Sequence, residues 1–296
     1  MIESEAKNFD VEHAEATLIL NLFGGKTEII FYDVLPEVVE VVFPRIEHEA
    51  MRLQKIFNFF DSDSELSRLN RKRKIHASPE LISVIRKAIW YSRATDGAYD
   101  VTKGRQFYSR KSGADEMPVG CSFRDITIRG NVVSLEHPDA LIDLGSIAKG
   151  FIADRIAMFI SSMGIDSFFI DARGDLIARG SYREIIDVQH PRIPNSTIST
   201  LLLKNRAVAT SGDYRQFSSD YSHSHIVGKK DVISATAIAG TLEDADAVAT
   251  CMMLLDSKKA EKLMSSLPYV SCLVINAGLQ ESRYNNFSRY ELKGRK

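Results

Sequence analysis

The chain has 296 residues, of which 44% are hydrophobic and 26% charged, proportions that are ordinary for a globular protein with a sizeable core. Its formal net charge of -1 gives no general electrostatic case for binding nucleic acid or a membrane surface. Three widely spaced cysteines form neither a disulfide framework nor a CxxC metal site. The sequence shows no apolar run of membrane-spanning length and no signal-peptide pattern at its acidic start. We therefore expect a cytoplasmic protein that binds no nucleic acid and does not insert into membranes.

The first part of the chain has clear periodicity. Alternating apolar residues over 16–33 predict a β-hairpin that turns at Gly24-Gly25. Apolar residues at helical spacing predict one helix over 36–60 and another over 79–91. The segment FDSDSELSRLN between them resembles the start of a calcium loop, but it lacks the glycine and the distal glutamate. We expect a capped loop there.

The middle of the chain mixes strands with one helix. A strand pair that turns at RGN is predicted over 123–136. The segment ALIDLGSIAKGFIADRIAMFISSMG, residues 140–164, predicts a strand, a glycine turn and a helix that stops at Gly164. Short strands are predicted after it, over 168–171, 176–179, 184–188, 200–203 and 207–210.

The last predicted elements are a strand over 232–239, a helix over 242–255 and a strand over 269–276. Thr241 is the expected N-cap of this helix, with Asp244 at the capping-box position. Strand pairs and helices follow one another without a regular βαβ rhythm. This pattern favours an α+β fold over a doubly wound sheet.

The last predicted helix places Asp246 and Thr250 on one face, one turn apart. A carboxylate and a hydroxyl oxygen are hard ligands that suit Mg²⁺ or Ca²⁺. The alternative is that Asp246 is an exposed acid favoured by the helix dipole and that Thr250 bonds back to a carbonyl. The pair alone favours this alternative, since Glu243 and Asp244 lie beside it.

A second candidate site is IDLGSIAKGF, residues 142–151. An acid ends the predicted strand, a glycine allows a tight turn, and Lys149 lies in the first helical turn. Free N–H groups and the positive dipole end suit a phosphate there. The Walker pattern is absent, and strand–glycine–helix junctions are common, so a purely structural role stays open.

Weaker signals occur after that segment. Turn chemistry explains Gly174-Asp175, and Ser211 would need a neighbouring base to act as a nucleophile. His223 and His225 could ligate a metal, but no third ligand is in view.

Six motifs, taken in order, resemble one known family. FDSDSELSRLN, TDGAYD, IDLGSIAKGFIAD, DARGD, VATSGDYRQF and DADAVAT are similar to motifs of the ApbE family, the FAD:protein FMN transferases, from about residue 23 to 255. The resemblance implies an α+β fold with mixed or antiparallel sheets, packed helices and a flavin and metal cleft. It implies one domain or two closely packed subdomains over residues 1–296, with a C-terminal tail from about residue 279. It also implies Mg²⁺-dependent transfer of FMN from FAD to a Thr or Ser hydroxyl of an acceptor protein, with release of AMP.

The same resemblance assigns roles to individual residues. Asp246 and Thr250 match the family's metal-binding residues, and the backbone carbonyl of Ser146 matches the third protein ligand. His225 matches the candidate base, which takes the proton of the acceptor hydroxyl. The positions that match FAD contacts are Phe23, Phe60, Ala98, Tyr99, Asp100, Asp143, Lys149 and Ile226.

The chain departs from the family pattern in two places near these residues. The loop around His225 lacks the usual Asp-Pro and Thr-Gly pairs. Arg173 stands where the family has glycine, so its side chain either pairs with a phosphate or crowds the cleft. Three functions stay open: the FMN transferase, an FAD pyrophosphatase that produces FMN and AMP, and a non-catalytic flavin-binding protein. The acceptor stays unidentified, because this chain lacks the family's acceptor motif, Asp-Gly-x-Ser/Thr-Gly-Ala-Ser/Thr.

Overall fold

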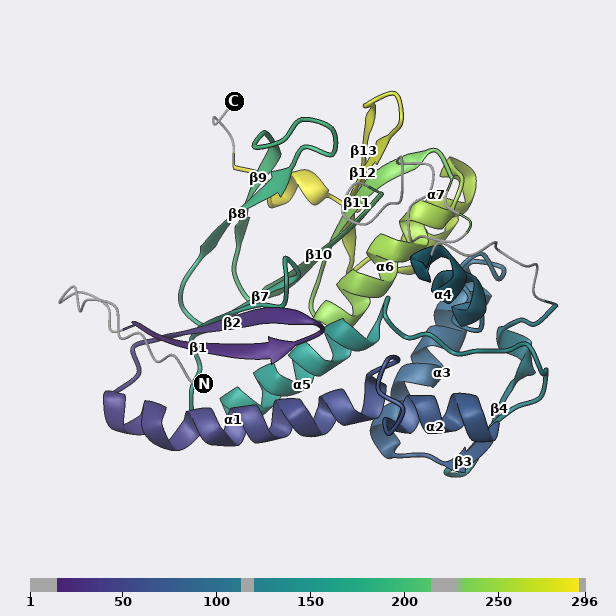
Figure 1. Cartoon of the computed structure of the whole chain (residues 1–296). Coiled ribbons are helices and arrows are strands. Elements are labelled where there is room, and N and C mark those ends of the chain that lie inside the picture. The colour runs from purple at the N-terminus through teal and green to yellow at the C-terminus, as the bar shows by residue number, and fades with distance from the viewer. Residues whose placement is uncertain (1–14, 113–119, 214–227, 229, 293–296) are drawn as a thin grey trace.

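The computed structural model describes residues 15–112, 120–213, 228 and 230–292, and a large antiparallel sheet dominates it (Figure 1). Its eight strands lie in the order β1-β2-β6-β7-β10-β11-β12-β13. Their bounds are β1 (Glu15–Leu22), β2 (Gly25–Tyr32), β6 (Phe168–Asp171), β7 (Leu176–Arg179), β10 (Arg206–Gly212), β11 (Val232–Ala239), β12 (Ser271–Asn276) and β13 (Glu281–Tyr284). Every neighbouring pair in it is antiparallel, which confirms the predicted α+β class.

Helices and two smaller sheets complete the described part of the chain. The helices are α1 (Pro36–Phe57), α2 (Glu65–Lys72), α3 (Pro79–Ala94), α4 (Gly104–Ser112), α5 (Ala148–Ser162), α6 (Leu242–Leu254) and α7 (Ser257–Ser266). The small sheets contain β3 (Lys74–His76), β4 (Ile126–Arg129) and β5 (Val132–Leu135), and the hairpin β8 (Glu184–Gln189) and β9 (Thr197–Leu203). In the ranges that the structure describes, no helix is both long and apolar enough to span a bilayer.

The large sheet is covered on both faces. On one face α6 packs across β10 and β11, and α1 and α5 lie side by side next to it (Figure 1). On the other face the β8–β9 hairpin contributes Val188 and Leu201 to a second buried cluster with Leu273 and Phe287. Because α6 lies between the sheet and other helices, most of its residues are buried.

Most of the predicted elements are confirmed within a few residues of their bounds. The β1–β2 hairpin turns one residue earlier than predicted, because Leu22 pairs with Gly25. The two turn residues are therefore Phe23 and Gly24, with φ of 57° and 76°. Positive φ at both positions is the requirement of a type I′ turn. Gly25 is left as the first residue of β2.

Three segments differ from their predictions. FDSDSELSRLN is not only a loop: Ser64 accepts the N–H of Ser67 and thereby caps α2. Residues 140–144 form no strand, because Asn70 and the 101–104 loop take their backbone hydrogen bonds. The expected tail from residue 279 contributes β13 and the buried Phe287 to the fold.

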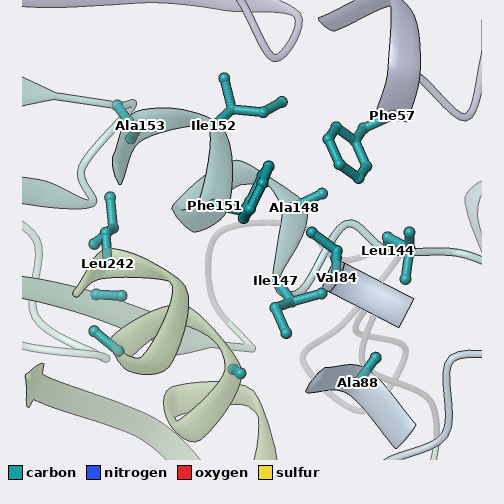
Figure 2. Close-up of a cluster of buried hydrophobic side chains, with 14 of the residues drawn as sticks. Phe57, Val84, Ala88, Leu144, Ile147, Ala148, Phe151, Ile152, Ala153 and Leu242 are labelled. Atoms are coloured by element: carbon teal, nitrogen blue, oxygen red, sulfur yellow. The ribbon is translucent and has the colours of Figure 1, made fainter. Parts of the chain in front are cut away.

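The helices meet in an apolar cluster at the first turns of α5. Figure 2 shows Phe151 of α5 among residues from neighbouring helices, including Phe57 of α1, Val84 of α3 and Leu242 of α6. The rings of Phe57 and Phe151 pack edge to face with centroids 5.5 Å apart.

Gly150 allows α5 to approach the start of α6 unusually closely. A Cβ added to Gly150 would lie 2.6 Å from the backbone nitrogen of Glu243, closer than real side chains come. The atoms in the way belong to the backbone of α6, which cannot rotate aside. The packing of these two helices therefore depends on a residue without a side chain.

We expect the substitution Gly150→Ala to lower the free energy of unfolding by about 2–4 kcal/mol, because α5 and α6 must move apart. Urea denaturation followed by circular dichroism would measure it. The matched control is Gly240→Ala, since a Cβ there would meet nothing within 4 Å, and its φ is not positive. Equal stability of the two variants would contradict the proposed close contact.

Candidate functional site

The start of α6 lies directly after β11 and is capped by Thr241. The hydroxyl of Thr241 accepts the backbone N–H of Asp244, which confirms the predicted N-cap. The Asp244 carboxylate does not complete a capping box. It accepts instead from the Thr241 hydroxyl, from the Tyr91 hydroxyl (2.6 Å) and from Lys87 (2.8 Å) of α3. The beginning of α6 is thus held in place by α3.

The helices α5 and α6 also satisfy each other's N-termini. The first N–H groups of a helix have no partner inside it. Asp154 of α5 accepts the N–H groups of Leu242 (2.9 Å) and Glu243 (2.8 Å) at the start of α6. In return, Gly150 near the start of α5 donates its N–H to Asp246 of α6, over 3.4 Å. This reciprocal arrangement fixes Asp246 beside the start of α5.

Asp246 is a buried carboxylate with few partners. Its exposed fraction is 6%, and the long bond from Gly150 is the one hydrogen bond that its side chain makes to any described residue. Burial raises the pKa of this carboxyl to about 7. The positive charge of Lys149 lowers this pKa in part, and the negative charge of Asp175 raises it further. The alternative prediction from the sequence, that Asp246 is an exposed acid in the first helical turn, is therefore wrong. A buried carboxylate of this kind is well suited to a bound cation.

Two other residues with oxygen donors lie on the same two segments as Asp246 and Gly150. Thr250 lies one turn further along α6, and its hydroxyl is 3.1 Å from that of Ser211 on β10. Ser146 precedes α5, with its hydroxyl 2.9 Å from that of Tyr99. The carbonyl of Ser146 accepts no hydrogen bond from the described residues, because the N–H of Gly150, four residues on, points to Asp246 instead.

These donors fit a magnesium ion in chemical type. A carboxylate, a hydroxyl and a backbone carbonyl are the all-oxygen ligands that Mg²⁺ accepts, usually with several waters. No group of three or more His, Cys, Asp and Glu side chains in the described ranges could hold a metal. A metal at this place would therefore depend on the hydroxyl of Thr250 and the carbonyl of Ser146 in addition to Asp246.

Lys149 lies in the first turn of α5, as the sequence predicts, and its positive charge acts on Asp246. Its ammonium group already has an acidic partner. Its ammonium forms an ion pair with Asp175, which is only 2% exposed and also accepts the N–H of Thr210 at 3.2 Å. Sequence reasoning explained Asp175 as a turn residue and so missed this role. Asp175 stands immediately before a buried strand, and an acid at that position was the signal in the sequence that it has a charged partner.

The residues expected to contact flavin lie in different surroundings. Phe60 is 58% exposed, with its ring edge to face against Phe59. Phe23 lies in the β1–β2 turn, where its N–H donates to Gln54. Asp143 accepts the N–H of Gly145. Their contact with a flavin stays a prediction.

The segment 98–100 has clear structural roles. Ala98 packs against the main core and Tyr99 is almost fully buried, with a pKa that burial raises well above its usual value. Both carboxylate oxygens of Asp100 accept hydrogen bonds, from Thr102 and from the N–H of Phe123. Through Tyr99 this segment contacts Ser146, and so it supports the loop before α5.

The predicted base His225 and the predicted flavin contact Ile226 lie outside the described residues. The described residues before them end just after β10, where Asp213 is fully buried. Arg192 forms a two-pronged ion pair with Asp213, at 2.8 Å and 3.0 Å. That pair ties Asp213, at the end of β10, to the segment that follows β8.

Comparisons with known proteins agree with these observations. A model of the ApbE family matches residues 23–274. The FAD:protein FMN transferase of Vibrio cholerae is 25% identical over 263 residues, covering 78% of this chain and 79% of that protein. The protein of the same name from Treponema pallidum is 25% identical over 312 residues, covering 89% and 84%.

Solved structures show the same fold. The flavin transferase ApbE from Vibrio cholerae has a TM-score of 0.77 at 22% identity and covers 94% of this chain and 99% of its own. The ApbE protein of Thermotoga maritima has a TM-score of 0.77 at 24% identity, covering 94% and 100%.

The carboxyl of Asp154 makes the stability of the fold depend on pH. Burial raises its pKa from 3.8 to about 6, so the folded protein keeps the proton at pH values where the unfolded chain has lost it. The protonated Asp154 therefore adds up to about 3 kcal/mol to the free energy of unfolding. This stabilisation is fully present below about pH 4 and is lost as the pH rises through 6.

We expect the stability of the wild type relative to Asp154→Asn to fall by that amount between pH 4 and pH 7. Urea denaturation of both proteins across this range would measure it, with Asp63→Asn as an exposed carboxylate control. A stability difference that stays constant with pH would show that Asp154 has no raised pKa.

Proposed function

Because this chain belongs to the ApbE family, we propose that it transfers FMN from FAD to a Thr or Ser hydroxyl of an acceptor protein, with release of AMP and with Mg²⁺ as cofactor. The names of the relatives support the flavin chemistry. The observation that supports a metal is the burial of the Asp246 carboxylate, which has one long hydrogen bond among the described residues. Thr250 lies one turn further along the same helix, and the Ser146 carbonyl accepts no hydrogen bond from the described residues.

Asp246, Thr250 and the carbonyl of Ser146 are the proposed metal ligands. A Mg²⁺ ion bound there supplies positive charge that offsets the charge of the pyrophosphate and of the departing phosphate. The reciprocal bonds between α5 and α6 support this proposal, because they join the helix that carries Asp246 and Thr250 to the helix that follows Ser146. Such pre-organisation matters because phosphoryl transfer depends mainly on charge stabilisation and positioning.

The start of α5 serves as the anion-binding element in this proposal. Lys149 contributes its ammonium group, and Asp175 orients that group in the ligand-free protein. FAD itself is held by the residues that match the family's contacts, which are Phe23, Phe60, Ala98, Tyr99, Asp100, Asp143, Lys149 and Ile226.

In the proposed reaction the acceptor hydroxyl oxygen attacks the phosphorus of the FMN half of FAD. The new oxygen–phosphorus bond forms as the bond to the bridging pyrophosphate oxygen breaks, and AMP leaves with that oxygen. His225 accepts the proton of the hydroxyl. We place the reaction in the cytoplasm, with an acceptor protein that remains to be identified.

The decisive experiment incubates the protein with FAD, Mg²⁺ and an acceptor fragment that carries the family's acceptor motif, and then measures intact mass and AMP. We expect a mass gain equal to FMN less one water, as a phosphodiester requires, loss of that gain with EDTA, and recovery with excess Mg²⁺. AMP release without a mass gain would indicate the pyrophosphatase instead. FAD bound without either product would indicate the non-catalytic flavin-binding protein.

Variants of the proposed ligands test the metal site. We expect Asp246→Asn and Thr250→Val to slow transfer at least about 100-fold, because several kcal/mol of transition-state stabilisation are lost. Thr250→Ser keeps the hydroxyl and should retain much of the activity. The rate of FMN attachment at a series of Mg²⁺ concentrations would measure these effects, with Asp63→Asn as the control. Wild-type rates for Asp246→Asn would rule out this metal assignment.

A further inference from the structure

Arg173 has a backbone conformation that its residue type disfavours. It lies in the turn between β6 and β7 with φ of 61°, in the left-handed region that normally favours glycine. The turn is tightly bonded, since Gly174 donates to the Asp171 side chain at 2.6 Å and Ala172 donates to the carbonyl of Asp175 at 2.8 Å. An unfavourable conformation held by its surroundings in this way is a reason to look for a function of the side chain.

The side chain of Arg173 extends from its own turn to the neighbouring turn between β1 and β2. Its guanidinium donates to the carbonyl of Phe23, in the turn between β1 and β2. On the way it crosses Gly25, where an added Cβ would lie only 2.7 Å from its Nε atom. The side chain therefore bridges two hairpin turns and depends on the missing side chain of Gly25.

Most of the guanidinium remains available to a ligand. Arg173 is exposed, and the carbonyl of Phe23 is its one hydrogen-bond partner within the described ranges. A guanidinium has five N–H donors in a planar fork, which matches two oxygens of a phosphate.

Arg173 belongs to the same turn as a charged residue of the site. Asp175, two residues further on, pairs with Lys149, and Lys149 in turn acts electrostatically on Asp246. When all are ionised, the two cations and two carboxylates of this group balance to zero. A bound divalent cation would raise the net charge to +2, which matches the two negative charges of a dinucleotide pyrophosphate.

We propose that Arg173 binds a phosphate of the flavin dinucleotide and is a specificity-determining residue that favours FAD over flavins without a phosphate. This inference rests on the proposed function, because it needs the pyrophosphate of FAD at this site. Arg173 contributes charge and paired hydrogen bonds in addition to those of Lys149, while the bond to Phe23 holds its side chain in place.

The test measures the Kd of FAD and of riboflavin by flavin fluorescence quenching, with Mg²⁺ present, at low and high salt. We expect Arg173→Gln to weaken FAD binding about 10- to 100-fold, most strongly at low salt, and to leave riboflavin binding unchanged. Arg173→Lys, which keeps the charge and loses the fork, should fall between these proteins. Arg129→Gln, at the exposed turn between β4 and β5, is the control.

Several outcomes would overturn the inference. An unchanged Kd for FAD in Arg173→Gln would remove Arg173 from the binding site. Equal weakening of FAD and riboflavin would assign it only a structural role between the two turns. Tighter FAD binding by Arg173→Gly would show that the side chain crowds the site. If the wild-type protein does not bind FAD at all, the proposed function fails as well.

Discussion

The contact between the first turns of α5 and α6 is the constraint on which the site depends. Each helix begins with N–H groups that its own backbone cannot satisfy, and each uses a carboxylate of the other. Asp154 serves α6 and Asp246 serves α5. The exchange is possible only because Gly150 has no side chain to separate the two backbones. As a result the positive ends of two helix dipoles lie close together, which favours any negative group placed between them.

Keeping charged groups in this interior has an energetic cost that the rest of the fold offsets. A carboxylate removed from water loses its hydration, and the buried Asp246 and Asp175 regain only part of it through Gly150, Lys149 and Thr210. Around them, α6 is anchored by α3 through Lys87 and by the sheet beneath it. Incompletely satisfied carboxylate oxygens inside a firmly held frame are a suitable arrangement for the cation that we propose here.

Local patterns in the sequence predict much of this structure, and contacts between distant residues account for most of the rest. Alternating apolar residues revealed the β1–β2 hairpin, and the spacing of Asp246 and Thr250 is visible because both lie on one helix. The helices α2, α4 and α7 have only 8, 9 and 10 residues, too few to be stable alone, so tertiary packing decides them. The reason for a glycine at position 150, in the first turn of α5, also lies almost a hundred residues away, in the backbone of α6. The roles of Asp154 and Asp175 could not be predicted from local patterns, because their hydrogen-bond and ion-pair partners are distant in the sequence.

The position of the N-terminal hairpin has a consequence for how the chain folds. Strand β2 pairs with β6, so that Glu28 lies opposite Asp171, 143 residues later in the chain. The edge of β2 that pairs with β6 therefore has no partner until the intervening helices, α1 to α5, have been made. Such long-range pairing slows folding and exposes strand surface to other chains in the meantime. The hairpin that carries Phe23 thus joins the sheet through a partner that five helices separate from it in the chain, and this pairing raises the contact order of the fold.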